Sequence, residues 1–212
     1  MKLILLGPPG SGKGTQAAFI RDRFQIPVIS TGDIIRAQLK SGSEEGLKLK
    51  SYIDKGELVP DDLVIRIVED RLAQPDCQNG FILDGFPRTV AQAQALEAMG
   101  TKVDAVIDIA LPDEIIVDRL SGRRVCPSCG ASYHTTVIPS ANGTHCDRCG
   151  SELVQRNDDT PAVIRNRLAV YRESTAPLTA YYRAEGKVIP ISSEGSVEDV
   201  KAAIFGALEA LQ

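Results

Sequence analysis

The chain has 212 residues, 43% of them hydrophobic and 25% charged, which is an ordinary globular composition with enough length for a sizeable core. Its net charge of −4 gives no electrostatic basis for general binding to nucleic acid. The apolar run after Lys2 is four residues long, too short for a secretory signal, and no segment approaches a membrane-spanning length. We therefore expect a cytoplasmic protein with neither a nucleic-acid nor a membrane partner.

Short apolar, β-branched runs alternate with stretches of helical character along the chain. The runs that predict strands are residues 2–6, 27–30, 80–84, 104–111 and 187–191. The stretches that predict helices are residues 14–24, 61–73, 89–99, 113–120, 161–184 and 197–211. We expect Thr89 and Asp113 to be N-caps, and Asp61 to begin a helix after Pro60. Continuous apolar strands separated by helices predict a three-layer α/β fold, in which helices cover both faces of a parallel sheet.

Two segments interrupt this alternation. The first, at about residues 30–59, is helical and polar, and it is too long for a simple crossover. The second, residues 122–159, is rich in turn residues. We expect both to be insertions into a core made of residues 1–29, 60–121 and 160–212.

The segment GPPGSGKGT, residues 7–15, directly follows the first apolar run. A glycine-rich turn between a strand and a helix presents backbone N–H groups and the positive end of the helix to a phosphate. Lys13 supplies a mobile charge for the outer phosphates, and a nearby hydroxyl can hold Mg²⁺. The alternative is a dinucleotide-binding loop, because Gly7, Gly10 and Gly12 also follow a strand, but such a loop has no use for Lys13. The segment predicts a triphosphate-binding loop.

Four cysteines form two C-x-x-C pairs, Cys126 with Cys129 and Cys146 with Cys149, with sixteen residues between the pairs. This is the spacing of a zinc ribbon, in which each pair supplies two thiolates to one tetrahedral ion. Disulfides, a redox-active pair and another thiolate-bound metal are the alternatives, and a cytosolic location disfavours the first. Four thiolates leave no position for water, so we expect a structural metal. Cys77 stands alone and predicts no role.

Arginines stand at the edges of both insertions. Arg119 and Arg123 are four positions apart, so they face the same way if the predicted helix continues through them. Most arginines are solvated surface charges, but guanidinium groups also bind phosphate oxygens bidentately and neutralise a phosphoryl group during transfer. The other candidates for that role are Arg36, Arg88, Arg156 and Arg167.

Asp84 ends the buried strand predicted at residues 80–84. Near a phosphate loop it can hold water on Mg²⁺, and the alternative is a turn aspartate before Gly85. Two enzyme classes are excluded. The histidines, His134 and His145, both lie in the cysteine-bearing insertion, which excludes a Ser-His-Asp hydrolase, and the Asn-Lys-x-Asp string of GTPases is missing.

Four motifs together resemble the adenylate kinase family: residues 7–15, the segment STGD at 30–33, DGFPRT at 84–89, and GRR at 122–124. More narrowly, the chain resembles the long-lid bacterial form, whose lid carries a zinc ribbon, from Met1 to the last helix. The resemblance implies a P-loop nucleoside monophosphate kinase fold with a five-stranded parallel sheet, an AMP-binding insertion and a zinc-binding lid. It also implies the reaction ATP + AMP ⇌ 2 ADP with Mg²⁺, in a monomer.

The resemblance further implies roles for individual residues. On the ATP side these are Gly10, Ser11, Gly12, Lys13, Gly14, Thr15, Arg119, Arg123, Ser132, Tyr133 and Gly195. On the AMP side they are Thr31, Arg36, Glu57, Leu58, Val59, Gly85, Phe86, Pro87, Arg88, Gln92, Arg156 and Arg167. The implied catalytic residues are Lys13, Arg88, Arg123, Arg156 and Arg167, and the implied zinc ligands are Cys126, Cys129, Cys146 and Cys149. Asp158 and Asp159 match lid carboxylates of the family but receive no firm role.

Two alternative functions stay open. A UMP/CMP or GMP kinase would share the phosphate loop and the arginines, although the long cysteine-bearing lid and Gln92 favour AMP. A zinc-ribbon ATPase that binds nucleic acid would be stimulated by RNA or DNA and would release phosphate, and the acidic charge of the chain disfavours it.

Overall fold

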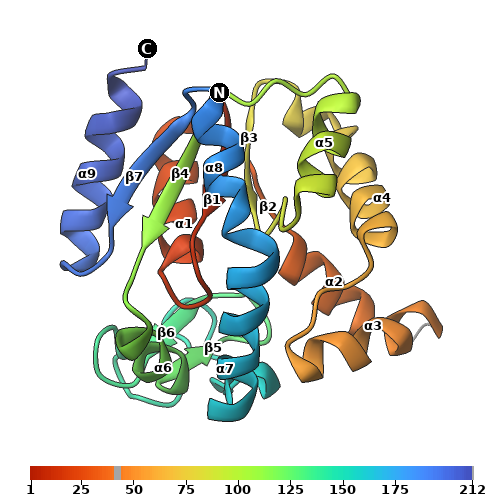
Figure 1. Ribbon diagram of the computed structural model, residues 1–212. Helices are drawn as coiled ribbons and strands as arrows, with labels where there is room; N and C mark the ends of the chain where they lie inside the picture. Colours follow the sequence, from red (N-terminus) through yellow and green to blue (C-terminus); the bar gives the residue numbers. More distant parts are fainter. Residues whose placement is uncertain (41–43, 212) are drawn as a thin grey trace.

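The computed structural model describes residues 1–40 and 44–211, so residues 41–43 of the first predicted insertion and residue 212 lie outside the described residues. Within the described part, five parallel strands form the central sheet in the order β2-β3-β1-β4-β7 (Figure 1). They are β1 (Lys2–Leu6), β2 (Val28–Ser30), β3 (Phe81–Asp84), β4 (Ala105–Ala110) and β7 (Val188–Ser192). The parallel sheet is confirmed, and each strand lies within one residue of its predicted bounds.

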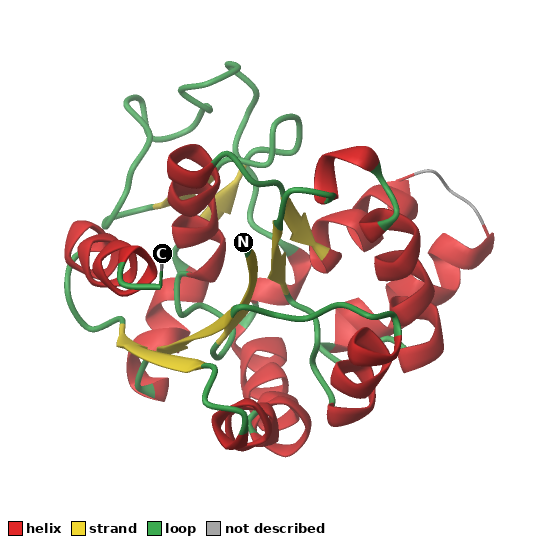
Figure 2. Ribbon diagram, turned by 90° about the horizontal axis from the view of Figure 1, so that it is seen from above, coloured by secondary structure: helices red, strands yellow, loops and turns green. Residues whose placement is uncertain are grey.

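Helices cover both faces of this sheet, as the apolar strands require (Figure 2). They are α1 (Lys13–Phe24), α2 (Thr31–Lys40), α3 (Glu44–Lys55), α4 (Asp61–Leu72), α5 (Val90–Ala98), α6 (Asp113–Ser121), α7 (Pro161–Val170), α8 (Pro177–Ala184) and α9 (Val197–Glu209). Alternate residues of β1 divide between the faces: Ile4 and Leu6 pack with α4, α5 and α8, whereas Leu3 and Leu5 pack with α1 and α9. The three-layer α/β prediction is therefore confirmed.

Two of the three predicted helix starts are confirmed. The Thr89 hydroxyl caps α5 by accepting a hydrogen bond from the Gln92 backbone N–H at 3.1 Å, and α4 begins at Asp61. The prediction for Asp113 is wrong, because Pro112 is the N-cap of α6 and Asp113 is its first helical residue. The reason is that Pro112 fixes an extended conformation immediately before the helix, so its carboxylate neighbour lies inside the first turn.

The helical stretch predicted over residues 161–184 is confirmed, with a π-helical turn at Tyr171–Thr175 between α7 and α8. Pro177 has no N–H group for the α-helical ladder, and the Ala176 N–H bonds instead to the Tyr171 carbonyl at 2.8 Å. The Thr175 hydroxyl donates to the Arg88 carbonyl at 2.9 Å, which attaches the turn to the loop after β3.

The two segments that interrupt the alternation have different structures. The described part of the first consists of α2 and α3, which pack on each other beside α4 (Figure 1). The second contains the antiparallel strands β5 (Arg123–Val125) and β6 (Ser132–His134), two isolated bridges, and turns. Within residues 1–40 and 44–211, no helix has both the length and the apolar character needed to cross a membrane.

All five strands of the central sheet end at the same edge, because they are parallel. The loops after β1, β2 and β3 leave this edge as the glycine-rich segment, helix α2 and the segment around Arg88. Ligands of open α/β sheets bind outside the carboxyl ends of the strands. The fold therefore gathers the predicted phosphate loop and several predicted arginines at one site.

Candidate functional site

The glycine-rich segment forms a tight loop between β1 and α1. Gly7, Gly10 and Gly12 have φ angles of +135°, +83° and +94°, in a region that favours glycine. A Cβ atom at Gly7 would lie 2.3 Å from the Ile109 carbonyl oxygen, so the loop is also pressed against β4. These contacts hold the backbone N–H groups of the loop at the positive end of α1, as a phosphate-binding loop requires.

Lys13 is the first residue of α1 and bends back over the loop. Its Nζ donates hydrogen bonds to the carbonyl oxygens of Gly7 and Pro8, both at 2.8 Å. Burial lowers the pKa of this amine to about 8, and it outweighs the opposing attraction of Asp84. A half-buried cation at the positive end of α1 is suited to an anionic ligand, which would replace the solvation that the amine has lost.

Asp84 lies next to the loop, as predicted. It is paired with Leu5 across β3 and β1, and a Cβ atom at Gly14 would lie 3.7 Å from its Oδ2 atom. The carboxylate therefore lies beside the first turn of α1, within ordinary contact distance of a side chain at position 14. A carboxylate next to a phosphate-binding loop is suited to a hydrated divalent cation.

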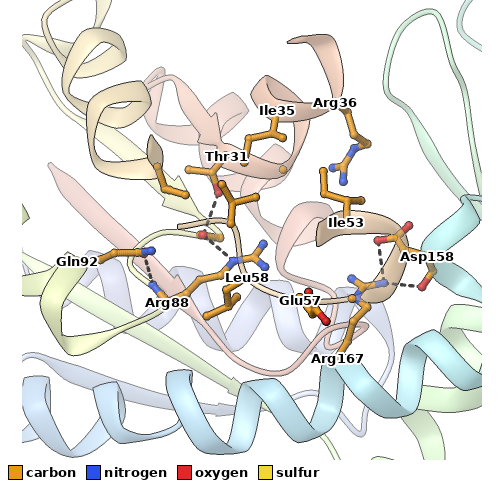
Figure 3. Close-up of a pocket in the computed structure, with 15 residues that line it drawn as sticks. Thr31, Ile35, Arg36, Ile53, Glu57, Leu58, Arg88, Gln92, Asp158 and Arg167 are labelled. Atoms are coloured by element: carbon orange, nitrogen blue, oxygen red, sulfur yellow. Dashed lines mark hydrogen bonds and ion pairs between the residues drawn. The ribbon is translucent and has the colours of Figure 1, made fainter. Parts of the chain in front are cut away.

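A pocket next to the loop contains most of the residues predicted for the AMP side (Figure 3). Nine of them line it: Thr31, Arg36, Glu57, Leu58, Val59, Gly85, Arg88, Gln92 and Arg167. The carbonyl oxygen of Gly85 orders one wall, because it accepts bonds from the Thr31 hydroxyl at 2.9 Å and from Arg88 Nε at 2.8 Å. The pocket combines apolar walls with cations at one end, which suits a base attached to a phosphate.

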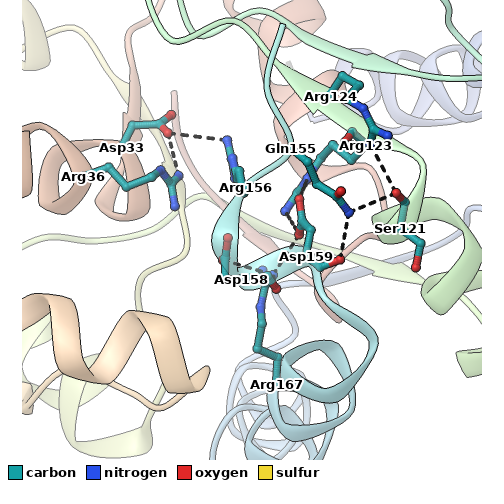
Figure 4. Close-up of polar contacts among 10 residues, drawn as sticks. All are labelled: Asp33, Arg36, Ser121, Arg123, Arg124, Gln155, Arg156, Asp158, Asp159 and Arg167. Atoms are coloured by element: carbon teal, nitrogen blue, oxygen red, sulfur yellow. Dashed lines mark hydrogen bonds and ion pairs between the residues drawn. The ribbon is translucent and has the colours of Figure 1, made fainter.

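Four arginines and three aspartates meet beyond the cationic end of the pocket (Figure 4). Arg123 binds Asp159 through two hydrogen bonds, of 2.5 and 2.8 Å, and Arg167 lies 3.2 Å from the same carboxylate. Asp159 is fully buried. The other members are Asp158, which lies 3.1 Å from Arg167, and Asp33, which lies 2.6 Å from Arg36 and 3.9 Å from Arg156.

The charges in this cluster perturb one another. Burial and the neighbouring Arg123 and Arg36 lower the pKa of Arg156 to about 10. Burial alone would raise the pKa of Asp158, but Arg167 and the other guanidinium groups outweigh it and hold the pKa below its ordinary value. Asp158 is therefore ionised and neutralises part of the arginine charge. Phosphate groups entering the site would offer the same guanidinium groups more negative charge than a carboxylate does.

Arg119 and Arg123 do not lie on one helix face, because the helix does not continue through Arg123. Helix α6 ends at Ser121, and Arg123 begins β5. Arg119 turns toward the end of β7, where its guanidinium donates to the hydroxyl of Ser193 at 3.1 Å and to its carbonyl at 2.8 Å. The Ser193 hydroxyl in turn donates to the Ser11 carbonyl at 2.9 Å, so Arg119 is held next to the phosphate loop.

The four paired cysteines converge in the second insertion. Their sulfur atoms all lie within 4.8 Å of one another, with Cys126 3.3 Å from Cys149 and Cys129 3.5 Å from Cys146. A hydrogen bond from the Tyr133 hydroxyl lowers the pKa of Cys146 to about 6. Four convergent sulfur atoms, one of them readily ionised, fit a metal site of the tetrahedral thiolate type.

A family model described as adenylate kinase matches residues 5–187, which is well over half of the 212-residue chain. The chain belongs to the adenylate kinase family. The adenylate kinase of Citrifermentans bemidjiense is 54% identical over 214 residues, covering 99% of this chain and 100% of the relative. That of Caldicellulosiruptor bescii is 51% identical over 212 residues, covering 98% and 99%. That of Methanocella arvoryzae is 49% identical over 215 residues, covering 100% of each chain.

Five of the residues that the adenylate kinase resemblance assigned to nucleotides lie outside the phosphate loop with its neighbour Arg119, the pocket and the arginine cluster. Phe86 and Pro87 are buried, and Phe86 belongs to the core beneath the pocket. Ser132 is exposed, and the Tyr133 hydroxyl lies beside the cysteines. Gly195 lies in the turn between β7 and α9, packed against Asp199. The structure therefore places these residues around the site and leaves their contact with a nucleotide as a prediction.

Sequence reasoning gave no role to four aspartates of this adenylate kinase that shape the site. Asp33, Asp158 and Asp159 pair with the arginines. The sequence offered one indication of this, because Asp33 follows Gly32 in a predicted motif and the other two follow the candidate Arg156 closely. Asp61 was predicted only as a helix start, but its carboxylate contacts Gln92 and Thr89. No sequence signal indicated that contact, because the partners are 31 and 28 positions away.

Proposed function

We propose that this member of the adenylate kinase family transfers the terminal phosphoryl group of MgATP to AMP, reversibly, to give two ADP. The arrangement at the carboxyl edge of the sheet carries the proposal: a phosphate-binding loop and a base-sized pocket open toward one cluster of arginines. Two sites for phosphates that share one set of cations support direct transfer between two nucleotides.

On the ATP side, the loop residues Gly10–Thr15 hold the phosphates, and Lys13 exchanges its two carbonyl partners for phosphate oxygens. Arg119, fixed by Ser193, lies where it would contact the nucleotide from the side of α6. Ser132, Tyr133 and Gly195 complete this side in the proposal. Asp84, which lies beside Gly14, would hold a hydrated Mg²⁺, and the Thr15 hydroxyl is the second candidate ligand. When bound, Mg²⁺ neutralises phosphate charge and holds the phosphates in line for transfer.

On the AMP side, the pocket takes the base between Thr31, the backbone of residues 57–59 and Gln92. Arg36 and Arg88 bind the AMP phosphate, and the Gly85 carbonyl fixes the Arg88 side chain for that task. Phe86 and Pro87 support this wall from the core. Desolvation by the surrounding protein, together with the nearby Arg167, lowers the pKa of Arg88, and an anion bound beside the guanidinium would offset both effects.

Catalysis then consists of positioning and charge stabilisation, because phosphoryl transfer leaves little covalent work for side chains. Lys13, Arg88, Arg123, Arg156 and Arg167 surround the region between the two phosphate sites. The site must also exclude water, since an activated terminal phosphate would otherwise be hydrolysed. The two insertions, residues 30–59 and 122–159, are suited to close over the nucleotides and to expel water.

We further propose that the four cysteines hold a structural Zn²⁺. The residues fit, because two C-x-x-C turns present their sulfur atoms to one point. The turns match each other: the N–H groups of Gly130 and Gly150 bond to the carbonyls of Cys126 and Cys146, at 3.1 and 2.8 Å. Four thiolates satisfy a tetrahedral ion completely, so the metal stabilises residues 122–159 and does not react.

The proposal also covers the arrangement of the whole protein. Residues 1–29, 60–121 and 160–212 would act as the core, residues 30–59 as the AMP-binding part and residues 122–159 as the lid. Every group named for the reaction comes from one chain, which supports a monomer, and the substrates are the adenine nucleotides of the cytoplasm.

A substrate panel tests the proposed function. Purified protein is mixed with MgATP and one nucleoside monophosphate at a time, and the formation of both diphosphates and of inorganic phosphate is followed. We expect AMP to be the best acceptor, with two ADP formed per ATP and no inorganic phosphate. The Lys13→Met variant, prepared in the same way, controls for a contaminating kinase. A preference for UMP, CMP or GMP, or release of phosphate stimulated by RNA or DNA, would contradict the proposal.

A further inference from the structure

The side-chain amide of Gln92 has one hydrogen-bond partner at each of its two ends. Its Oε1 atom lies 2.7 Å from the Arg88 backbone nitrogen, and its Nε2 atom lies 2.7 Å from Asp61 Oδ1. Gln92 is only 2% exposed, although it lines the pocket (Figure 3). Both ends of the amide therefore already have a protein partner before any ligand enters.

The chemistry of the two partners decides which end of the amide is which. A backbone N–H group can only donate, so the atom facing Arg88 must be the carbonyl oxygen. An ionised carboxylate can only accept, so the atom facing Asp61 must be the amide nitrogen. A flipped amide would place two donors together at Arg88 and two acceptors together at Asp61. The orientation of the Gln92 amide thus follows from its hydrogen-bond partners. It does not depend on telling the amide oxygen and nitrogen apart by position alone.

Asp61 is itself held in place by a second contact. Its Oδ2 atom accepts a hydrogen bond from the Thr89 hydroxyl at 2.8 Å, and that hydroxyl accepts from the Gln92 backbone N–H at 3.1 Å. The first residue of α4 is in this way joined to the N-cap of α5 and to the first turn behind it. Rotation of the carboxylate would break the Thr89 bond as well as the Gln92 bond.

We propose that Asp61 is a positioning residue that sets the preference of the pocket for a 6-amino purine over a 6-oxo purine. This inference rests on the proposed function, because it takes Gln92 to face the base of the monophosphate. With both partners in place, the amide keeps one free lone pair on Oε1 and one free hydrogen on Nε2. Adenine offers an amino donor and a ring-nitrogen acceptor to such a pair, whereas a 6-oxo purine offers an acceptor carbonyl where adenine has its donor.

A fixed amide discriminates because it cannot adapt to the wrong base. Facing a 6-oxo purine, Oε1 would oppose the carbonyl oxygen, and the mismatch could be relieved only by flipping the amide. Asp61 and the Arg88 N–H are the two barriers to that flip. Removing Asp61 leaves one barrier, so the expected effect is a partial loss of discrimination, on the order of tenfold for one charge-assisted hydrogen bond.

The test compares AMP with inosine 5′-monophosphate, which replaces the 6-amino group by a carbonyl at almost unchanged size. For each variant, kcat/KM with MgATP and the equilibrium binding of each monophosphate alone are measured. The variants are Asp61→Ala, which removes the acceptor, and Asp61→Asn, whose side-chain oxygen can still accept from Gln92. The matched control is Asp62→Ala, the next residue of the same helix turn, whose carboxylate is exposed and lies 3.9 Å from Arg66.

We expect Asp61→Ala to lower the ratio of AMP to inosine monophosphate, in kcat/KM and in binding, by roughly tenfold. Asp61→Asn should restore most of the ratio, and Asp62→Ala should leave it unchanged. Equal losses with both monophosphates in Asp61→Ala would mean that Asp61 only supports the fold, and would overturn the inference. The same change in Asp61→Ala and Asp62→Ala would assign the effect to the helix N-terminus and would overturn it too. The assay of the unmodified protein separates the two proposals. If that protein does not phosphorylate AMP, the proposed function itself fails, whatever the variants do.

Discussion

Replacing Lys13 with methionine should stabilise the ligand-free protein while removing most of its activity. Two carbonyl oxygens of the loop hold the amine, and burial lowers its pKa from 10.5 to about 8. At neutral pH the folded protein therefore keeps a charged amine in surroundings that disfavour it. Methionine has a similar length and carries no charge, so it relieves this penalty and cannot bind phosphate.

The size of the expected stabilisation follows from the lowered pKa of Lys13. A lowering from 10.5 to about 8 corresponds to about 3 kcal/mol of penalty on the charged form at pH 7. The hydrogen bonds to Gly7 and Pro8 are lost in the variant and offset part of the gain. We expect a net stabilisation of about 1–2 kcal/mol, or roughly 3–6 °C in the thermal midpoint of a chain of this size. Activity should fall on the order of a thousandfold, as expected for a charge that acts on the transferring group.

The stabilisation should depend on pH in a defined window. Between about pH 8 and pH 10.5 the unfolded lysine is protonated and the folded one is not, so the unfolded state binds more protons and stability rises with pH. The variant lacks this contribution. The stability advantage of the variant should therefore be largest below pH 8 and should be lost as the pH approaches 10.5, where only the missing hydrogen bonds remain and the unmodified protein becomes the more stable of the two.

Urea denaturation of both proteins at several pH values between 7 and 10.5, without nucleotide, measures this difference. Lys102→Met is the matched control, because Lys102 is exposed and far along the chain from the loop. A variant less stable than the unmodified protein at pH 7, or a difference that does not change with pH, would refute the assigned environment of Lys13. Near-normal turnover of Lys13→Met would refute the phosphate loop itself.

Three other substitutions test separate parts of the site. Cys129→Ser should lower both the metal content and the thermal midpoint while ATP binding persists, and equal stability of metal-free and metal-loaded protein would contradict a structural metal. Asp159→Asn should reduce the free energy of unfolding by about 3 kcal/mol, because it leaves Arg123 and Arg167 without their shared buried carboxylate; an unchanged urea midpoint would contradict this. Gln92→Ala should relax the preference for AMP more than it lowers kcat, as a substrate panel would show, whereas a uniform loss with all monophosphates would assign Gln92 to the fold.

The sheet was predictable because a strand buried on both faces must be apolar throughout, as Leu3 to Leu6 are. The phosphate loop was predictable because glycine is needed where the φ angles are positive, and Lys13 separates this loop from a dinucleotide loop. The cysteine cluster followed from spacing alone, since a C-x-x-C pair can present both sulfur atoms to one ion.

What could not be predicted depends on contacts between distant segments. The π-helical turn forms where Thr175 bonds to the Arg88 carbonyl, and Arg123 leaves the helix of Arg119 to meet Asp159, 36 positions later. Asp61 looked like an ordinary first-turn acid, because nothing in its own segment shows that Gln92 lies beside it. Local patterns report which elements form, whereas the side chains that orient the site are set by packing between elements.

The reaction of ADP alone tests the proposed transfer most directly. The protein is incubated with MgADP as the only nucleotide, and ³¹P NMR follows ATP, AMP and inorganic phosphate over time, with the Lys13→Met variant as the blank. If two phosphate sites share the arginines around Asp159, a phosphoryl group passes directly from one ADP to the other. We then expect equal amounts of ATP and AMP, and no inorganic phosphate. Formation of AMP with inorganic phosphate and without ATP, or no reaction at all, would contradict direct transfer between two bound nucleotides.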